Sequence, residues 1–260
     1  MQQLVFISGL HRSGTSILHR TLSASNQISG FSGTGVPEDE GQHLQSVFPP
    51  ARAFGGAGKF AFAKEARLDE NSTLISPENR AKLLNEWKIH WDESKPIWIE
   101  KSPPNIIRTR FLQALFPEAF FITIVRHPVA VSLATQKWSK TALPELIRHW
   151  IAAHNIYQED RTHLKNELFF SYEYMVQNPL ELITALEEFL GTTLPYDHNI
   201  RNTSNKYFEK WETEKPWELK KKLVKSKCIK LFESSVNDLG YSLTDLTRYP
   251  NLGRNGSVAS

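Results

Sequence analysis

The chain has 260 residues, 40% of them hydrophobic and 11% aromatic, which is enough for one large α/β domain with a sizeable core. Its formal net charge of +3 is too small to argue for a nucleic-acid partner, although it suits an enzyme that handles a polyanionic cofactor. The single cysteine, Cys228, excludes an internal disulfide framework and a cysteine-based metal site. The first apolar stretch is short and lacks a basic flank, so we expect no signal peptide, no membrane span and a cytoplasmic location.

The first predicted element is a short apolar strand that breaks into a polar loop and then a helix beginning near Thr15. Gly9 and Gly14 permit a backbone that turns successive N–H groups toward one anion, and the helix adds the positive end of its dipole. Thr15 stands where ATP- and GTP-hydrolysing loops place a lysine. Arg12 in the loop and the hydroxyls of Thr15 and Ser16 offer other donors to a phosphate. The sequence predicts a phosphate-binding loop, and a tight turn without a ligand is the plain alternative.

An acidic run follows in the loop after this helix, where a glycine- and serine-rich stretch at 29–37 leads into Glu38, Asp39 and Glu40. In open α/β sheets such loops lie outside the carboxyl ends of the strands, where ligands bind. One of these carboxylates is predicted to be a general base that deprotonates an acceptor hydroxyl. The alternative is an acidic cap on a helix that begins near Gln42. Both roles are compatible, because only one base is needed.

Two later strands are also predicted to end in a cation. The strand over 96–100 is followed directly by Lys101, and the strand over 120–125 by Arg126. Neighbouring strands of a βαβ unit end at the same edge of the sheet, so these side chains should converge on the loop. There Lys101 would neutralise charge on a leaving phosphate oxygen, and Arg126 would hold a second phosphate, unless it merely pairs with an acidic neighbour.

The remaining pattern alternates strand and helix. We expect a partly helical excursion over 48–74, helices from Pro77 and over 106–116, 128–136, 144–164, 179–190 and 216–239, and a fourth strand over 168–172. Tyr172 at the end of that strand would stack on a purine or simply pack. The polar stretch 196–211 would close over a nucleotide, with Asn205 or Lys206 on phosphate, or serve only as a connection.

This alternation predicts an α/β fold with three layers, α/β/α, around a mainly parallel sheet. We expect a single domain over 1–245 and a flexible tail over 246–260. His149, His154 and His163 lack the acidic ligands that would complete a zinc site, so no metal is expected.

Two motifs resemble those of a known family. The loop Gly-Leu-His-Arg-Ser-Gly-Thr-Ser at 9–16 and Ile-Val-Arg-His-Pro at 124–128 both follow strands, as in the sulfotransferases that use 3′-phosphoadenosine 5′-phosphosulfate. The likeness extends through Phe-Phe-Ser-Tyr-Glu at 169–173 and is strongest toward the tyrosylprotein and bacterial branch. The resemblance implies a fold like that of P-loop nucleoside triphosphatases.

The resemblance also implies roles for individual residues. The 5′-phosphosulfate would be held by Arg12, Ser13, Gly14, Thr15 and Ser16, the 3′-phosphate by Arg126, and the adenine by a site near Tyr172. Lys101 would stabilise the bridging oxygen. Ser132 is the nearest replacement for a family serine, because position 134 is Ala; similarly, Pro103 stands where some members have a histidine base. The base would therefore be Glu40, with Glu38 as its rival.

The implied reaction moves a sulfuryl group to the hydroxyl of a carbohydrate, phenol, peptide or small molecule and releases adenosine 3′,5′-bisphosphate. Glu40, Lys101 and Arg12 would be its catalytic residues. An ATP-dependent small-molecule kinase and a non-catalytic nucleotide-binding protein remain as alternatives at this point. The acceptor class and the oligomeric state stay open, and no nucleic-acid partner is expected.

Overall fold

The computed structural model describes residues 2–195, 202–212 and 219–255. Its centre is a six-stranded sheet in the order β2-β3-β1-β4-β5-β6. The strands are β1 (Gln3–Ser8), β2 (Ile28–Gly30), β3 (Ile97–Lys101), β4 (Phe120–Val125), β5 (Glu167–Ser171) and β6 (Gly253–Asn255). All pairings are parallel except that of β6 with β5. The predicted α/β fold with a mainly parallel sheet is confirmed.

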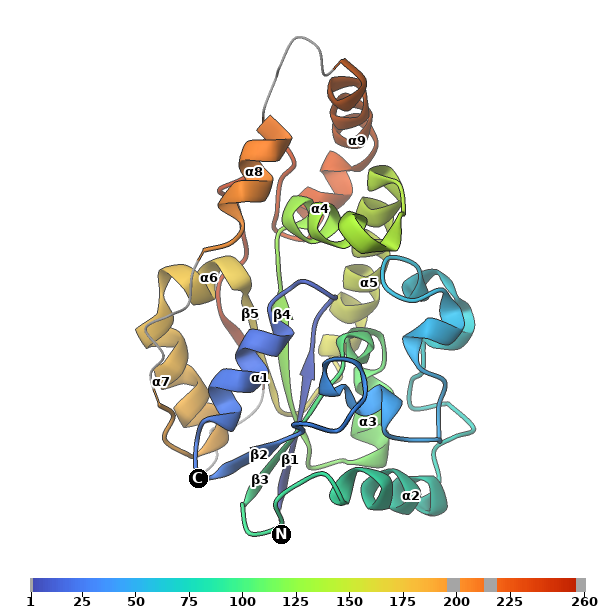
Figure 1. Ribbon diagram of the computed structural model, residues 1–260, viewed down its shortest axis with the longest axis vertical. Helices are drawn as coiled ribbons and strands as arrows, with labels where there is room; N and C mark the ends of the chain where they lie inside the picture. The colour runs from blue at the N-terminus through green and yellow to red at the C-terminus, as the bar shows by residue number, and fades with distance from the viewer. Residues whose placement is uncertain (1, 196–201, 213–218, 256–260) are drawn as a thin grey trace.

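Helices cover both faces of this sheet (Figure 1). Val5 and Ile7 of β1 pack in one apolar cluster with α1 and α7, whereas Phe6 packs in another with α2 and α3, since successive side chains of a strand point to opposite faces. The helices are α1 (Thr15–Ser23), α2 (Pro77–Lys88), α3 (Thr109–Leu115), α4 (Pro128–Ser139), α5 (Leu143–Arg161), α6 (Tyr172–Gln177), α7 (Pro179–Leu190), α8 (Asn205–Glu212) and α9 (Leu219–Asp238). Within the described residues no helix combines the length and apolar composition needed to cross a membrane.

The excursion over 48–74 and the loop before it are built from short 3₁₀ turns. These are Pro37–Asp39, Gly41–His43, Ala51–Phe54, Phe60–Phe62 and Lys64–Ala66. The helix expected over 106–116 is also divided, into a 3₁₀ turn at Pro103–Ile107 and α3. Arg108 breaks it: this buried residue leaves helical geometry and donates hydrogen bonds to the carbonyls of Ala66 and Pro49, at 2.9 and 3.0 Å. The divided helix thereby holds the excursion against the sheet.

Two other elements end or begin at residues different from those predicted. Tyr172 does not end a strand but begins α6, where Ser171 caps the helix by accepting from the Tyr174 amide at 3.0 Å. Within the polar stretch 196–211, residues 196–201 lie outside the described residues, and Asn205–Glu212 form α8 instead of a loop. Tyr207 and Trp211 form its buried face, which explains why so polar a sequence is helical.

The chain after residue 245 contributes to the sheet. Leu246 is buried, and Gly253–Asn255 pair antiparallel with β5 at its outer edge. The flexible tail expected from residue 246 therefore includes ordered chain up to 255. Residues 256–260 lie outside the described residues.

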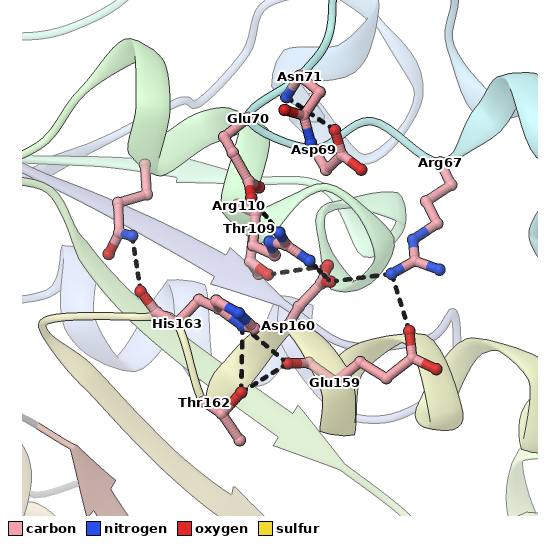
Figure 2. A network of polar contacts seen from close by, with 11 residues as sticks. Arg67, Asp69, Glu70, Asn71, Thr109, Arg110, Glu159, Asp160, Thr162 and His163 are labelled. Atoms are coloured by element: carbon pink, nitrogen blue, oxygen red, sulfur yellow. Dashed lines mark hydrogen bonds and ion pairs between the residues drawn. The ribbon is translucent and has the colours of Figure 1, made fainter.

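A polar network fastens the excursion to α3 and α5 (Figure 2). Asp160 of α5 is fully buried, and its Oδ1 lies 3.4 Å from Nη2 of Arg67 and 3.8 Å from Nη1 of Arg110. Arg67 also pairs with Glu159 at 2.9 Å, and Arg110 with Glu70. One buried carboxylate thus joins two arginines from segments that are distant in sequence.

Asp160→Asn is expected to change how stability depends on pH. Burial raises the pKa of Asp160 to about 6, although Arg67 and Arg110 act in the opposite direction. The native state therefore binds a proton before the unfolded chain does, and the contribution of this carboxyl to stability grows as the pH falls from 8 to 5. Urea unfolding at both pH values should show that the free energy of unfolding of wild type, relative to that of Asp160→Asn, is higher at pH 5 than at pH 8. Asp238→Asn removes the same charge from an exposed position and is the control. An equal difference between wild type and Asp160→Asn at both pH values contradicts the prediction.

Candidate active site

The loop between β1 and α1 has an unusual backbone. Gly9 and Gly14 have φ values of 147° and 109°, and Arg12 has a φ of 73°. A Cβ atom at Gly9 would clash with the carbonyl oxygen of Ile124 in β4, so the loop can pass this strand only with glycine. Arg12 has a side chain and is strained in the left-handed region. Strain of this kind is typical of loops that are shaped to hold a ligand.

Unused hydrogen-bond donors gather where this loop becomes α1. Gly14 is the N-cap, no side chain caps the helix, and its first turn contains no acidic residue. The hydroxyl of Ser13 is buried and has no hydrogen-bond partner within the described part of the chain. The N–H groups of the first turn and this hydroxyl suit an anion, which also interacts favourably with the helix dipole. The residues present therefore fit the phosphate end of a nucleotide.

Arg126, directly after β4, lies beside the loop. Its Nη1 donates to the carbonyl oxygen of Arg12 at 2.9 Å, and its Nε and Nη2 donate to Oγ of Ser204 at 3.1 and 3.0 Å. Nη2 also donates to Oγ1 of Thr203 at 3.0 Å, and the guanidinium carbon lies 4.1 Å from the ring centroid of Tyr172. The structure thus brings Arg126, Arg12 and Tyr172 together. It also places the hydroxyls of Thr203 and Ser204 on Arg126, a contact that was not predicted.

A buried carboxylate stands behind these hydroxyls. Glu173 accepts from the His127 amide at 3.2 Å and from the Ser204 hydroxyl at 3.3 Å. Burial raises the pKa of Glu173, and the nearby Arg126 acts to lower it. Glu173 therefore orients Ser204 toward Arg126. The sequence offered one indication of this residue, a glutamate following an apolar strand.

Lys101 and Glu40 meet at the neighbouring strand end. Lys101 ends β3, which pairs with β1, and its side chain is 1% exposed. Its Nζ donates to the carbonyl oxygen of Glu38 at 2.7 Å and lies 3.6 Å from Oε1 of Glu40. Burial raises the pKa of Glu40, and the charge of Lys101 partly offsets this effect. The two side chains thus form a buried pair of acid and cation.

The other two acids of the run differ from Glu40. Glu38 is exposed, and its carboxylate accepts from Oγ of Ser16 at 3.4 Å. Asp39 accepts from the amide and the hydroxyl of Thr34, at 2.8 and 2.6 Å, and so closes its own turn. Of the three acids, only Glu40 is both buried and close to Lys101.

Glu100 is a buried acid that the sequence analysis did not single out. Its carboxylate accepts a hydrogen bond from Oγ of Ser102 at 2.5 Å. The same Oγ accepts from the backbone N–H of Gln42 at 2.9 Å. Burial raises the pKa of Glu100 to about 7. A Cβ atom at Gly41 would clash with Glu100, so the turn that carries Glu40 packs directly on this carboxyl. A glutamate within an otherwise apolar strand was the available indication.

A cleft of about 480 Å³ opens between the loop, the acidic run and the excursion. Its lining includes Arg12, Thr15, Ser16, Glu40, Arg52 and Trp138. The candidate base, the anion-binding loop and a wall from the excursion therefore face one space, which is large enough for a small acceptor.

Ser132 and Lys206 are two further residues that were predicted to contact the donor. Ser132 is buried, and its hydroxyl has no hydrogen-bond partner among the described residues; it lines a small pocket of about 10 Å³ with His149 and with His11, which also lines the cleft. Lys206 is exposed in the first turn of α8, where its Nζ lies 5.2 Å from the ring centroid of Tyr207.

Comparisons with known proteins identify the family and the fold. A model of the family described as "Sulfotransferase family" matches residues 4–197, whereas no curated protein matches. A sulfotransferase from Alicyclobacillus acidocaldarius matches with a TM-score of 0.50 and 16% identity, over 91% of this chain and 94% of that one. Sulfotransferase STF9 from Mycobacterium avium matches with a TM-score of 0.51 and 13% identity, over 82% of this chain and 69% of that one. At these identities the two structures show a shared fold.

Proposed function

The chain belongs to the sulfotransferase family, and from this premise we propose that Glu40, Lys101 and Arg12 catalyse transfer of a sulfuryl group to an acceptor hydroxyl. The donor of this enzyme is 3′-phosphoadenosine 5′-phosphosulfate. The observation that carries the residue assignment is the buried pair of Lys101 and Glu40, 3.6 Å apart, beside the cleft that the anion-binding loop lines.

The donor supplies, when bound, a sulfuryl group activated by its bond to the 5′-phosphate. In the proposal, Ser13, the first turn of α1 and the guanidinium of Arg12 hold this end of the donor. Arg126 binds the 3′-phosphate, and the ring of Tyr172 lies near the adenine. Support comes from the Ser13 hydroxyl, which has no partner where the chain is described, and from the proximity of Arg126 to both Arg12 and Tyr172. Ser132, which is buried, and Lys206, in the first turn of α8, stay predicted contacts of the donor.

In the transfer step, Glu40 removes the proton of the acceptor hydroxyl as the hydroxyl oxygen bonds to sulfur. Lys101 and Arg12 stabilise the 5′-phosphate oxygen, which keeps the electron pair of the broken S–O bond and leaves on adenosine 3′,5′-bisphosphate. Positioning and charge stabilisation carry most of the catalysis, as in phosphoryl transfer. The deeply buried Lys101 suits this role because charge interactions strengthen where water is excluded.

A product screen tests the reaction itself. The purified protein, the donor and a mixed library of hydroxyl compounds should give products that gain one sulfo group by mass spectrometry, together with adenosine 3′,5′-bisphosphate. Glu40→Gln protein is the matched control for transfer without enzyme. A kinase would instead consume ATP, and a non-catalytic binding protein would release no bisphosphate from any acceptor mixture; either result contradicts the proposal.

Arg126→Ala is expected to weaken binding of adenosine 3′,5′-bisphosphate by about 10- to 100-fold, the usual range for losing a charge-assisted contact. Adenosine 5′-phosphate, which lacks the 3′-phosphate, should lose much less affinity. Calorimetry with both ligands measures the difference, and it also shows whether wild type prefers the bisphosphate to ATP. An equal loss for both ligands would mean that Arg126 acts only by bracing Arg12.

A further inference from the structure

One cation in the acceptor cleft has no assigned role. Arg52 lies in the 3₁₀ turn Ala51–Phe54, its side chain is exposed, and it lines the cleft. Within the described residues it forms no ion pair with any carboxylate, whereas Arg67, Arg110 and Arg148 are all paired. An unpaired arginine in a cleft is suited to a ligand anion, because its planar guanidinium matches a carboxylate or sulfate.

The turn that bears Arg52 is tied to the proposed base by one buried side chain. Nε2 of Gln42 donates to Oε2 of Glu40 at 2.5 Å, and Oε1 of Gln42 accepts from the Ala51 amide at 2.8 Å. Gln42 is only 3% exposed. The carboxylate of Glu40 and the backbone next to Arg52 are therefore held by the two ends of the same amide.

His43 lies beside Glu40 and lines the same cleft, but it does not compete with Arg52 for an anionic ligand. Its Nε2 lies 3.9 Å from Oε2 of Glu40. Burial lowers the pKa of His43, and the charges of Arg52 and Lys101 lower it further, so the imidazole is neutral near pH 7. Among the described residues that line the cleft, Arg52 is then the cation available to the acceptor, since Arg12 is assigned to the donor.

An aromatic surface completes the cleft. Trp138, at the end of α4, is 52% exposed although it lines the cleft. Its ring lies edge-to-face against His11, with centroids 6.1 Å apart, and His11 contacts Phe60 in the same manner at 6.0 Å. A large ring that is held on one side and open on the other is a surface on which a ring of the ligand can stack.

We propose that the acceptor is a ring compound that carries an acidic group as well as the reacting hydroxyl. Arg52 binds the carboxylate or sulfate of this acceptor, Trp138 packs against its ring, and the hydroxyl then faces Glu40. This inference rests on the proposed function, because it concerns the acceptor of the same site. It adds the chemical class of that acceptor.

The test measures binding with matched pairs of compounds that differ only in the acidic group. The sugar pair is methyl glucuronide and methyl glucoside, and the aromatic pair is 4-hydroxybenzoate and 4-hydroxybenzamide. Calorimetry is done with protein saturated with adenosine 3′,5′-bisphosphate, so no turnover is needed. Wild type should bind the acidic member of at least one pair about tenfold more tightly, the usual effect of one charge-assisted contact. Which pair responds identifies the ring as a sugar or a phenol.

Arg52→Ala should abolish this preference, and Trp138→Ala should weaken both members of the responding pair equally. Lys64→Ala removes one charge from an exposed position outside the cleft and should leave the preference intact. Equal binding of both members by wild type overturns the inference, and so does loss of bisphosphate affinity in Arg52→Ala, which would place Arg52 on the donor. If the preference holds but no product gains a sulfo group, the proposed function fails, and what remains is a binding site for an acidic ring compound that is not an acceptor.

Discussion

Replacing Glu40 by Gln is expected to lower kcat by about 10²- to 10⁴-fold, the usual cost of losing a general base. The amide keeps the shape of the side chain and can still accept from Gln42, but it cannot take the proton of the acceptor hydroxyl. Affinity for adenosine 3′,5′-bisphosphate should not change. The measurements are product formation by mass spectrometry under saturating donor and acceptor, and calorimetry with the bisphosphate.

Two observations separate a base from a merely structural acid. Glu38→Gln, in the same run but exposed, should keep kcat within a few-fold of wild type. In wild type, burial raises the pKa of Glu40, so the rate should fall as the pH is lowered through that raised value and level off above it. Loss of this acid limb in Glu40→Gln supports the assignment. A large loss of kcat in Glu38→Gln with little loss in Glu40→Gln would instead assign the base to Glu38.

Lys101→Met is expected to reduce kcat by about 10²- to 10³-fold, which is typical for removing one group that stabilises charge in the transition state. Met fills most of the buried volume that Lys101 occupies, so the fold is disturbed less than by Ala. A second effect follows from the 3.6 Å contact with Glu40. Lys101 lowers the pKa of Glu40, so its removal should move the acid limb of the pH profile to higher pH.

This shift distinguishes a role in the site from a loss of stability. A variant that is only less stable should lose activity without moving the acid limb, and its melting temperature should fall. Leu84→Ala, a half-buried position on α2 that lines no part of the cleft, provides a destabilised control. Full activity in Lys101→Met with a suitable acceptor would contradict the assignment.

The parts of the site that follow strands were predictable from sequence. Glycine spacing places a sharp loop after β1, and the rule that parallel strands share a carboxyl edge brings Lys101 and Arg126 to that loop. The sheet order confirms this arrangement, because β3 and β4 both flank β1. The loop and the shared edge were predictable because both follow from the order of strands and helices, and the hydrophobic pattern of the sequence predicts that order.

The parts that depend on tertiary packing were not predictable. The family resemblance favours Glu40 over Glu38, but the residue pattern itself shows no difference between them. They differ in burial, because Glu38 lies in the exposed 3₁₀ turn Pro37–Asp39 and Glu40 lies between this turn and the next. The partners of Arg126, Thr203 and Ser204, come from a stretch 77 and 78 residues later. The strands β2 and β6 have three residues each, too few for a pattern of alternating side chains to be recognised.

The side-chain amide of Gln42 limits how the acceptor specificity of this enzyme can be changed by engineering. Because it holds Glu40 at one end and the Ala51 backbone at the other, an exchange of residues 48–74 is expected to disturb the proposed base unless this contact is kept. A transplanted segment must present a backbone N–H where Ala51 does. Without it, the side chain of Gln42 is expected to change its orientation and to shift the carboxylate of Glu40 that it contacts. Libraries for altered specificity should therefore vary Arg52 and Trp138 and keep Gln42, Gly41 and position 51 fixed.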